Sequence, residues 1–306
     1  MVNESLHSQL TIGHSQLAIK SRLAPHTDTP ALDAQVLLAH VTGHPRAWLL
    51  AHPEAPLTPT EAAHLEQTLQ QLENGLPLPY VLGEWEFFGL KFKVTPEVLI
   101  PRPETELLVE TALEWLKHFL RDEDLQAADI GTGSGCIAIS LAVNCPQLHI
   151  LATDLSPAAL ALARQNAALH QVSDRITFLE ADLLAPRHSP PATPHAPLTL
   201  ITANLPYIPT ATLHTLDVYG REPTLALNGG PDGLTLIRRL LAQTATRLAP
   251  GGLILLEIEA TQGASVTALA RQHYPDADIR LYPDLAGYDR LLSIQTPSVE
   301  IRLVAR

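Results

Sequence analysis

Asn204-Leu205-Pro206-Tyr207 is the string with the clearest chemical potential, and it follows the apolar run 198–203. An Asn side-chain amide offers an acceptor oxygen to an N–H donor. The backbone around Pro206 is stiff, because proline fixes its own φ and restricts the residue before it. The aromatic face of Tyr207 can lie over a flat group. The string therefore predicts a site that holds a planar –NH2 group, of an amide or an exocyclic amine. The lone pair of its nitrogen would be directed outward, so that a chemical group can be transferred to the nitrogen.

A glycine-rich loop lies earlier in the chain and is a candidate ligand site. It reads Gly131-Thr132-Gly133-Ser134-Gly135, between a predicted strand that ends at Ile130 and a predicted helix. Glycines at alternate positions let the backbone approach a ligand closely, and the helix N-terminus favours polar or anionic groups. A dinucleotide fingerprint would place a third small residue at position 136, which is cysteine here. The spacing therefore departs from the pattern typical of a pyrophosphate ligand.

Acidic residues follow the next two predicted strands. A carboxylate at Asp154 can accept both hydroxyls of a ribose, by the logic of nucleotide-binding folds. Asp182 could contact an adenine edge, with Leu183 beside the ring. Either carboxylate could instead cap a helix or lie solvated in a loop. Three such strand ends in succession favour an adenosine ligand without a diphosphate.

The elements expected to position these residues fall into three segments. Residues 1–75 show helical periodicity and predict a small helical domain, with a helix starting at Pro30 and another from Pro59 to Leu72. Residues 76–104 combine aromatic and β-branched residues with glycines from Tyr80 onward, which predicts a β-hairpin linker.

Residues 105–306 alternate predicted strands and helices, which indicates a parallel sheet covered on both faces. Strands are expected to end at Ile130, Thr153, Leu179, Ala203 and Ile258. The segments 279–281 and 290–294 predict a terminal antiparallel pair. The proline-rich stretch 186–197 predicts a surface connection. The fold class is therefore α/β.

Composition excludes several classes of function. A net charge of −12 argues against broad phosphate binding, so no direct nucleic-acid partner is expected. No apolar run is long enough for a membrane span and no signal-peptide pattern is evident. Two cysteines give no disulfide scaffold, and the 14 histidines are scattered, so no metal site is expected. The default location is the reducing cytoplasm.

With its glycine loop and acidic strand ends, the chain resembles the class I S-adenosylmethionine methyltransferases. The resemblance implies a Rossmann-like, seven-stranded sheet with a reversed last strand, and S-adenosyl-L-methionine as the cofactor. The cofactor contacts that it implies are Gly131, Thr132, Gly133, Ser134, Gly135, Asp154, Asp182, Leu183 and Asn204.

Methyl transfer to an amide requires help for the acceptor, because an amide nitrogen shares its lone pair with the carbonyl. Asn204 Oδ1 and the main-chain carbonyl of Leu205 could each accept one N–H, while Tyr207 stacks on the acceptor plane. The alternative is a strand end finished by an Asn-x-Pro turn. The family pattern is Asn-Pro-Pro-Tyr, so Leu205 departs from it. Asn-Leu-Pro-Tyr also occurs among ribosomal RNA adenine dimethyltransferases.

Three further segments bear on the substrate. Pro101-Arg102-Pro103-Glu104-Thr105 resembles a signature of peptide chain release-factor glutamine N5-methyltransferases, which implies substrate contacts at Arg102 and Glu104. The alternative is a helix start with Pro103 in the first turn and a surface pair between Arg102 and Glu104. The stretches 221–234 and 256–263 resemble the same family, although Arg221 stands where an aromatic residue is frequent.

The resemblance implies methylation of the glutamine side-chain nitrogen in the Gly-Gly-Gln loop of class 1 release factors, with the N-terminal helices gripping the factor. An RNA dimethyltransferase would be expected to place its cofactor domain first and to be more basic. The alternatives are a glutamine N5-methyltransferase of a ribosomal protein, an N6-adenine nucleic acid methyltransferase, and a cofactor-binding protein that has lost catalysis.

Overall fold

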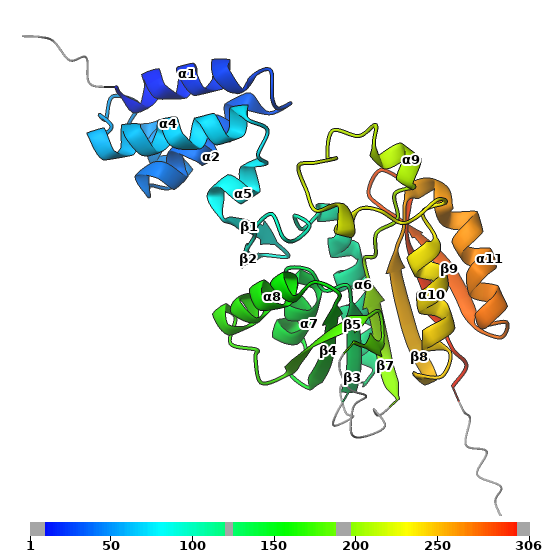
Figure 1. Ribbon diagram of the computed structural model, residues 1–306. Coiled ribbons are helices and arrows are strands. Elements are labelled where there is room, and N and C mark those ends of the chain that lie inside the picture. The colour runs from blue at the N-terminus through cyan, green and yellow to red at the C-terminus, as the bar shows by residue number, and fades with distance from the viewer. Residues whose placement is uncertain (1–9, 120–124, 188–196, 299–306) are drawn as a thin grey trace, which may run out of the picture. The chain divides into compact units, whose positions relative to one another are not determined.

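The structure is a computed structural model that describes residues 10–119, 125–187 and 197–298 (Figure 1). The chain divides into two compact units, Met1–Glu84 and Trp85–Arg306. The proline-rich connection predicted at 186–197 falls almost entirely on residues outside the described ranges. Within those ranges, no helix is both long and apolar enough to cross a membrane.

The smaller unit is helical, as predicted. Its described helices are α1 (Ile12–Leu23), α2 (Pro30–Thr42), α3 (Arg46–Ala51), α4 (Pro59–Glu73) and α5 (Leu78–Leu82). Leucine and isoleucine side chains from the first four of them bury one apolar core. Helix α4 begins with a capping box, in which the Thr58 side chain accepts from Glu61 N and the Glu61 side chain accepts from Thr58 N.

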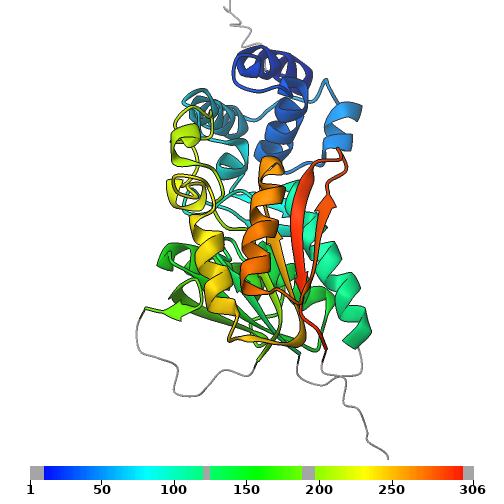
Figure 2. The same ribbon diagram turned by 90° about the vertical axis from the view of Figure 1, so that its right-hand side faces the viewer.

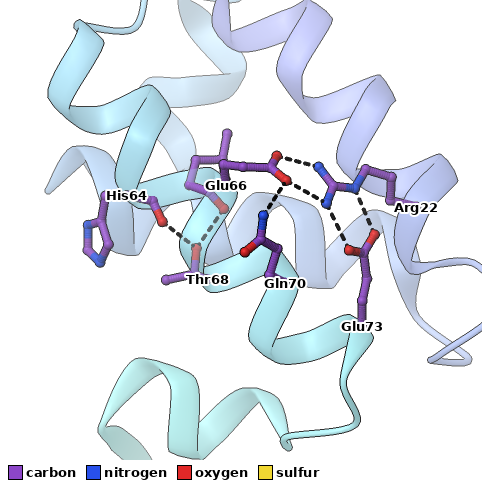
Figure 3. Close-up of polar contacts among 7 residues, drawn as sticks. Arg22, His64, Glu66, Thr68, Gln70 and Glu73 are labelled. Atoms are coloured by element: carbon purple, nitrogen blue, oxygen red, sulfur yellow. Dashed lines mark hydrogen bonds and ion pairs between the residues drawn. The ribbon is translucent and has the colours of Figure 1, made fainter.

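One arginine ties α1 to α4 (Figure 3). The Arg22 guanidinium lies between two carboxylates of α4, with Nη1 2.5 Å from Glu66 Oε2 and Nε 2.7 Å from Glu73 Oε1. Gln70 Nε2 donates to Glu66 Oε1 from the same helix. Hydrogen bonds from Arg22 hold the pKa of both carboxyls below the ordinary range. The fork of a guanidinium can satisfy two carboxylates at once, which lysine cannot do.

Replacing Arg22 with alanine is expected to loosen the smaller unit by about 1 kcal/mol, because partly exposed ion pairs are individually weak and count mainly as networks. Amide hydrogen exchange of the full-length protein would show faster exchange in α1 and α4. Lys20→Ala, in the same last turn of α1, is the matched control. Equal exchange in the two variants would show that the network stabilises nothing.

The predicted hairpin is present but shorter than expected. It consists of β1 (Glu84–Phe87) and β2 (Leu90–Lys93). The prediction began the hairpin at Tyr80, whereas residues 80–82 belong to α5. That helix is stopped by Gly83, whose φ of 70° forms a left-handed cap. A five-residue helix is too short to show the periodicity that distinguishes it from a strand.

The two-residue turn of the hairpin is specified by its backbone. Phe88 and Gly89 both have positive φ, at 53° and 69°, as a type I′ turn requires. The flanking Phe87 and Phe92 are buried in the core of the larger unit. The hairpin is therefore held by apolar burial on that unit.

The larger unit is built on the predicted sheet, with the order β6-β5-β4-β3-β7-β8-β10-β9. The neighbours from β5 to β8 run parallel, and β10 runs antiparallel between β8 and β9. Seven strands with a reversed last strand match the expectation, and the two-residue β6 adds an antiparallel edge. The strands are β3 (Leu125–Ile130), β4 (Leu148–Asp154), β5 (Ile176–Asp182), β6 (Ala185–Pro186), β7 (Leu198–Ala203), β8 (Leu248–Glu257), β9 (Asp278–Pro283) and β10 (Asp289–Gln295).

Helices cover both faces of this sheet (Figures 1 and 2). Alternate residues of β3 point to opposite faces, so Ala127 joins one core and Ala128 the other. The first core takes side chains from α6 (Glu106–Leu116), α7 (Cys136–Asn144) and α8 (Pro157–Leu169). The second takes them from α10 (Thr235–Thr244) and α11 (Gly263–His273), which lie side by side in Figure 2.

The strand ends decide where a site can form. Strands β3 and β7 end at Ile130 and Ala203 as predicted, while β5 continues past Leu179 to Asp182. Because the carboxyl ends of parallel strands meet at one edge, the segments that follow β3, β4, β5 and β7 lie together there.

Candidate functional site

A pocket of about 450 Å³ lies at the carboxyl ends of these strands. The predicted site residues that line it are Arg102, Gly131, Thr132, Gly133, Ser134, Asp154, Asp182, Leu183, Asn204, Leu205 and Pro206. Gly135, Tyr207 and Glu104 are not among its lining residues, and Glu104 is exposed. Most of the residues singled out in the sequence are thus brought to one cavity.

The glycine loop depends on backbone conformations that other residues rarely adopt. Gly131, Gly133 and Gly135 have φ values of 73°, 54° and 83°. The N–H groups of Gly131 and Thr132 both donate to Thr153 O, at 2.8 and 2.9 Å. A Cβ on Gly135 would lie 2.8 Å from Ile139 Cδ1, so this glycine serves the start of α7. The loop is therefore tied both to β4 and to its own helix.

Beneath the loop lies Asp129, which was not among the predicted site residues. Its side chain is 1% exposed, and it accepts hydrogen bonds from Thr132 Oγ1 at 2.6 Å and Thr202 Oγ1 at 3.0 Å. Burial raises the pKa of Asp129 to about 6. The carboxyl group therefore joins the glycine loop to β7, which leads to Asn204. An acidic residue before a glycine loop is the signal that could have found it.

Asp154 makes the helix-capping contact that the sequence allowed, and its proposed ribose contact stays a prediction. It lines the pocket, and its Oδ1 accepts from Ser156 N at 2.8 Å before α8 begins. Its Oδ2 accepts from Gly133 N at 2.9 Å. Burial raises its pKa above the ordinary value for aspartate. The carboxylate is thus fixed against the glycine loop on the wall of the pocket.

Asp182 has a partner that the sequence did not indicate. Its Oδ2 lies 2.7 Å from Arg239 Nη2 on α10, and both residues line the pocket. The next residue, Leu183, has a φ of 59°, which is strained for a branched side chain. The N–H of Leu184 donates to Gln243 Oε1 at 2.8 Å, which helps to hold this turn. Leu183 is buried and faces the same cavity.

The Asn-Leu-Pro-Tyr turn meets the glycine loop. A Cβ on Gly131 would lie 3.2 Å from Leu205 Cδ2, so the two segments are in van der Waals proximity. The Leu205 side chain is buried in the core that contains Ile130. Asn204 Nδ2 donates to Thr105 Oγ1 at 3.0 Å. The two halves of the predicted site are therefore adjacent.

Tyr207 is directed at a buried carboxyl group. Its hydroxyl lies 3.5 Å from Oε1 of Glu257, the last residue of β8, and its carbonyl accepts from Gln262 Nε2 at 2.9 Å. Burial and the charge of Glu257 raise the pKa of Tyr207 above its ordinary value. The predicted stacking of Tyr207 on an acceptor group stays a prediction.

A second glycine-rich loop supports this turn from behind. A Cβ on Gly229 would lie 2.7 Å from Pro206 O, and one on Gly233 would collide with Tyr207 O. The N–H of Gly229 donates to Ile208 O at 2.8 Å. Only glycine allows so close an approach, which explains the glycines of this segment physically.

Arg102 is paired, but with a different partner from the one considered. The alternative interpretation joined Arg102 to Glu104, whereas its guanidinium contacts Glu222 Oε1. Glu222 is buried and also accepts from Ile100 N at 3.1 Å. A buried carboxylate needs such partners to offset its lost hydration. Glu222 therefore anchors the Arg102 segment beside the pocket.

In the ranges 10–119, 125–187 and 197–298, no group of three or more His, Cys, Asp or Glu side chains could hold a metal ion. The donors and acceptors of the pocket instead suit an organic ligand. Glycine backbone and two carboxylates line one part, and an Asn amide lies next to them. Such an arrangement can hold an adenosine-type group beside an N–H donor.

Comparisons with known proteins identify the relatives of this chain. Residues 17–83 match the family model of the PrmC N-terminal domain, and residues 105–192 match the methyltransferase small domain. A release factor glutamine methyltransferase of Moorella thermoacetica is 44% identical over 274 residues, covering 89% of this chain and 94% of the relative. One from Bordetella pertussis is 41% identical over 263 residues, covering 86% and 93%.

Among solved structures, the N-terminal domain of human METTL16 in complex with SAH aligns with a TM-score of 0.51 at 17% identity. The alignment covers 84% of this chain and 93% of that one. At this identity the likeness concerns the fold, and it supports the α/β methyltransferase architecture.

Gly233→Ala is expected to destabilise the protein by about 2–4 kcal/mol, because the new methyl group collides with the Tyr207 carbonyl and the backbone is strained as well. Gly287→Ala is the matched control, since Gly287 also has positive φ but has no atom within 4 Å of an added Cβ. Thermal unfolding of the two full-length variants measures the difference. Equal melting temperatures would contradict a supporting role for the second loop.

Proposed function

The chain belongs to the release factor glutamine methyltransferase family, and we propose that it methylates the side-chain amide nitrogen of the glutamine in the Gly-Gly-Gln loop of class 1 peptide chain release factors. The observation that carries the proposal is the contact between the glycine loop and the Asn-Leu-Pro-Tyr turn in one pocket. A methyl donor on the first segment would lie beside an amide held by the second.

The residues present fit S-adenosyl-L-methionine. Gly131 and Gly133 of the glycine loop line the pocket, and Asp154 and Asp182 offer carboxylate oxygens suited to hydroxyl and amino groups. Thr132 and Ser134 line the same wall, and Leu183 offers an apolar surface for a ring. When bound, this cofactor supplies an electrophilic methyl group on its sulfonium.

Asn204 and Leu205 act on the acceptor. Asn204 Oδ1 and the Leu205 carbonyl each accept one N–H of the glutamine amide, which directs the nitrogen lone pair toward the methyl group. The methyl group that a bound cofactor would supply would replace one N–H hydrogen of the amide, and that proton would leave to water. Fixed dipoles that match the charge developing on nitrogen lower the barrier without reorganisation.

Leu205 in place of the family's proline is compatible with this role. Its side chain is buried against the glycine loop. The proposed chemistry does not use this side chain. The acceptor function belongs to the main-chain carbonyl, which both residue types have. Pro206 still stiffens the turn.

We assign Tyr207, Arg102 and Glu104 to the release factor side of the site. Arg102 lines the pocket and is anchored by Glu222, while Glu104 is exposed next to it. Tyr207 follows the acceptor turn directly. Arg102 and Glu104 can contact the segments that flank a glutamine loop, and Tyr207 keeps its proposed role of stacking on the acceptor plane.

The domain roles follow the same assignment. We propose residues 1–75 as the helical domain that grips the release factor, 76–104 as the hairpin linker, and 105–306 as the methyltransferase domain. The match of residues 17–83 to the PrmC N-terminal domain supports the first of these. The division of the chain between Glu84 and Trp85 falls inside the proposed linker.

The net charge of −12 favours a protein over a nucleic acid as the partner. With a translation factor as the substrate, we propose that the reaction takes place in the cytoplasm.

Incubation with methyl-labelled S-adenosylmethionine is expected to label a class 1 release factor, and changing the glutamine of its Gly-Gly-Gln loop to alanine should stop the labelling. Mass spectrometry of the loop peptide locates the methyl group. Labelling of RNA or of a ribosomal protein in place of the factor, or equal labelling of the alanine variant, would overturn the proposal.

Asn204→Ala is expected to lower the methylation rate by about 100-fold or more, as loss of one preorganised polar group does in other active sites. Calorimetric titration should show that the cofactor still binds, since most of its expected contacts remain. Asn144→Ala is the control, because Asn144 is an exposed amide that bonds only locally to Ser140 O. A full rate in Asn204→Ala would remove Asn204 from the acceptor site.

A further inference from the structure

Helix α10 supports the pocket wall where strand β5 ends. Arg239 Nη2 donates to Asp182 Oδ2 at 2.7 Å, and Gln243 Oε1 accepts from Leu184 N at 2.8 Å. Positions 239 and 243 are one helical turn apart, so both side chains leave the same side of the helix. The helix therefore contacts the residues on either side of Leu183.

Leu183 is the reason that this turn needs support. Its φ of 59° lies in the left-handed region, which a branched side chain rarely adopts. Such a conformation persists where the surrounding structure fixes it. Here the contacts of α10 lie immediately before and after Leu183, and Leu183 shares an apolar core with Leu240 and Leu241 of the same helix. The backbone that carries Asp182 is therefore held in place by the protein itself.

The ion pair uses only one oxygen of the Asp182 carboxylate. Its Oδ2 accepts from Arg239, whereas Oδ1 has no hydrogen-bond partner among the described residues. An unpaired carboxylate can rotate about its last side-chain torsion, because that torsion is broad. A guanidinium on one oxygen restricts this rotation and leaves the other oxygen able to accept. Since Asp182 and Arg239 both line the pocket, the remaining acceptor belongs to the ligand site.

A second pair on the same helix shows what an ordinary surface ion pair looks like here. Arg238 Nη2 lies 2.8 Å from Asp232 Oδ2, and the two side chains are 47% and 50% exposed. The corresponding values for Arg239 and Asp182 are 2.7 Å, 44% and 45%. The pairs differ in their place, because the described lining of the pocket includes Arg239 and Asp182 but neither Arg238 nor Asp232.

We propose that Arg239 is a positioning residue for the cofactor, which fixes the Asp182 carboxylate so that its Oδ1 accepts a hydrogen bond from the amino group of the adenine. This inference rests on the proposed function, which supplies the adenosine ligand. Arg239 acts through Asp182 and need not touch the ligand. An acceptor that is already oriented loses less freedom when the ligand binds, so the cost of ordering falls. Arg239 therefore governs cofactor affinity and leaves the transfer step to Asn204 and Leu205.

Arg239→Ala is expected to raise the Kd of S-adenosylhomocysteine by about three- to fivefold at low salt, which is the size of effect that a partly exposed ion pair can have. Calorimetric titration measures this binding, since S-adenosylhomocysteine carries the same adenosine and no methyl group to transfer. The kcat at saturating cofactor and the KM for the release factor should stay unchanged. Arg238→Ala is the matched control, and it should bind as the wild-type protein does. Thermal unfolding should show that both variants are folded.

A double-mutant cycle with Asp182→Asn tests whether Arg239 acts through Asp182. Once the carboxylate has been replaced, Arg239→Ala should have little further effect on the Kd, because the group that Arg239 positions is gone. Arg239→Lys should bind with an intermediate Kd, since an ammonium keeps the charge but lacks the planar fork of a guanidinium.

An unchanged Kd in Arg239→Ala, an equal loss of affinity in Arg238→Ala, or additive effects in the double variant would each overturn the inference. A wild-type protein that binds S-adenosylhomocysteine but labels no release factor would refute the proposed substrate and leave the role of Arg239 standing.

Discussion

One buried carboxyl group, that of Asp129, holds the two halves of the pocket in register. It accepts one hydrogen bond from Thr132 in the glycine loop and one from Thr202 on the neighbouring strand. Loss of this acceptor would leave the buried Thr132 hydroxyl without its partner, at a cost of about 1–3 kcal/mol, while Thr202 Oγ1 would keep only its longer contact of 3.4 Å to Ala128 O. The contact between Gly131 and Leu205 depends on that register, and so does the placement of Asn204. The rest of the pocket wall is built around the ends of β3 and β7, which Asp129 holds together.

Much of the fold could be predicted because its signals are local. The glycines of the loop, the polar residue after each apolar run and the proline in the acceptor turn all act through their immediate neighbours. Strand ends at Ile130 and Ala203 were therefore correct, as was the antiparallel pair formed by residues 279–281 and 290–294. The hairpin was placed too early, because the short helix α5 is defined by its left-handed cap at Gly83 more than by periodicity.

The polar partners inside the site could not be predicted, because they come from distant parts of the chain. Arg102 bonds Glu222, 120 residues away, and Asn204 bonds Thr105, 99 residues away. Asp182 meets Arg239 across 57 residues. No spacing rule connects such positions, and a lone Glu at a strand end is usually expected to be solvated. Only the folded structure shows that Glu257 is buried and that its carboxyl group lies next to the Tyr207 hydroxyl.

The anchor of the glycine loop on Asn166 makes the shape of the loop depend on segments that are far apart in sequence. The Asn166 side chain bonds Ser134 O in the loop and both Lys93 N and Lys93 O on β2, so it joins three segments that are far apart in sequence. Contacts of this kind carry a loop-closure entropy that local contacts avoid. The glycine loop therefore keeps its shape only while β2 and α8 are both folded against it. A change that loosens either element would reach the pocket without touching a residue that lines it.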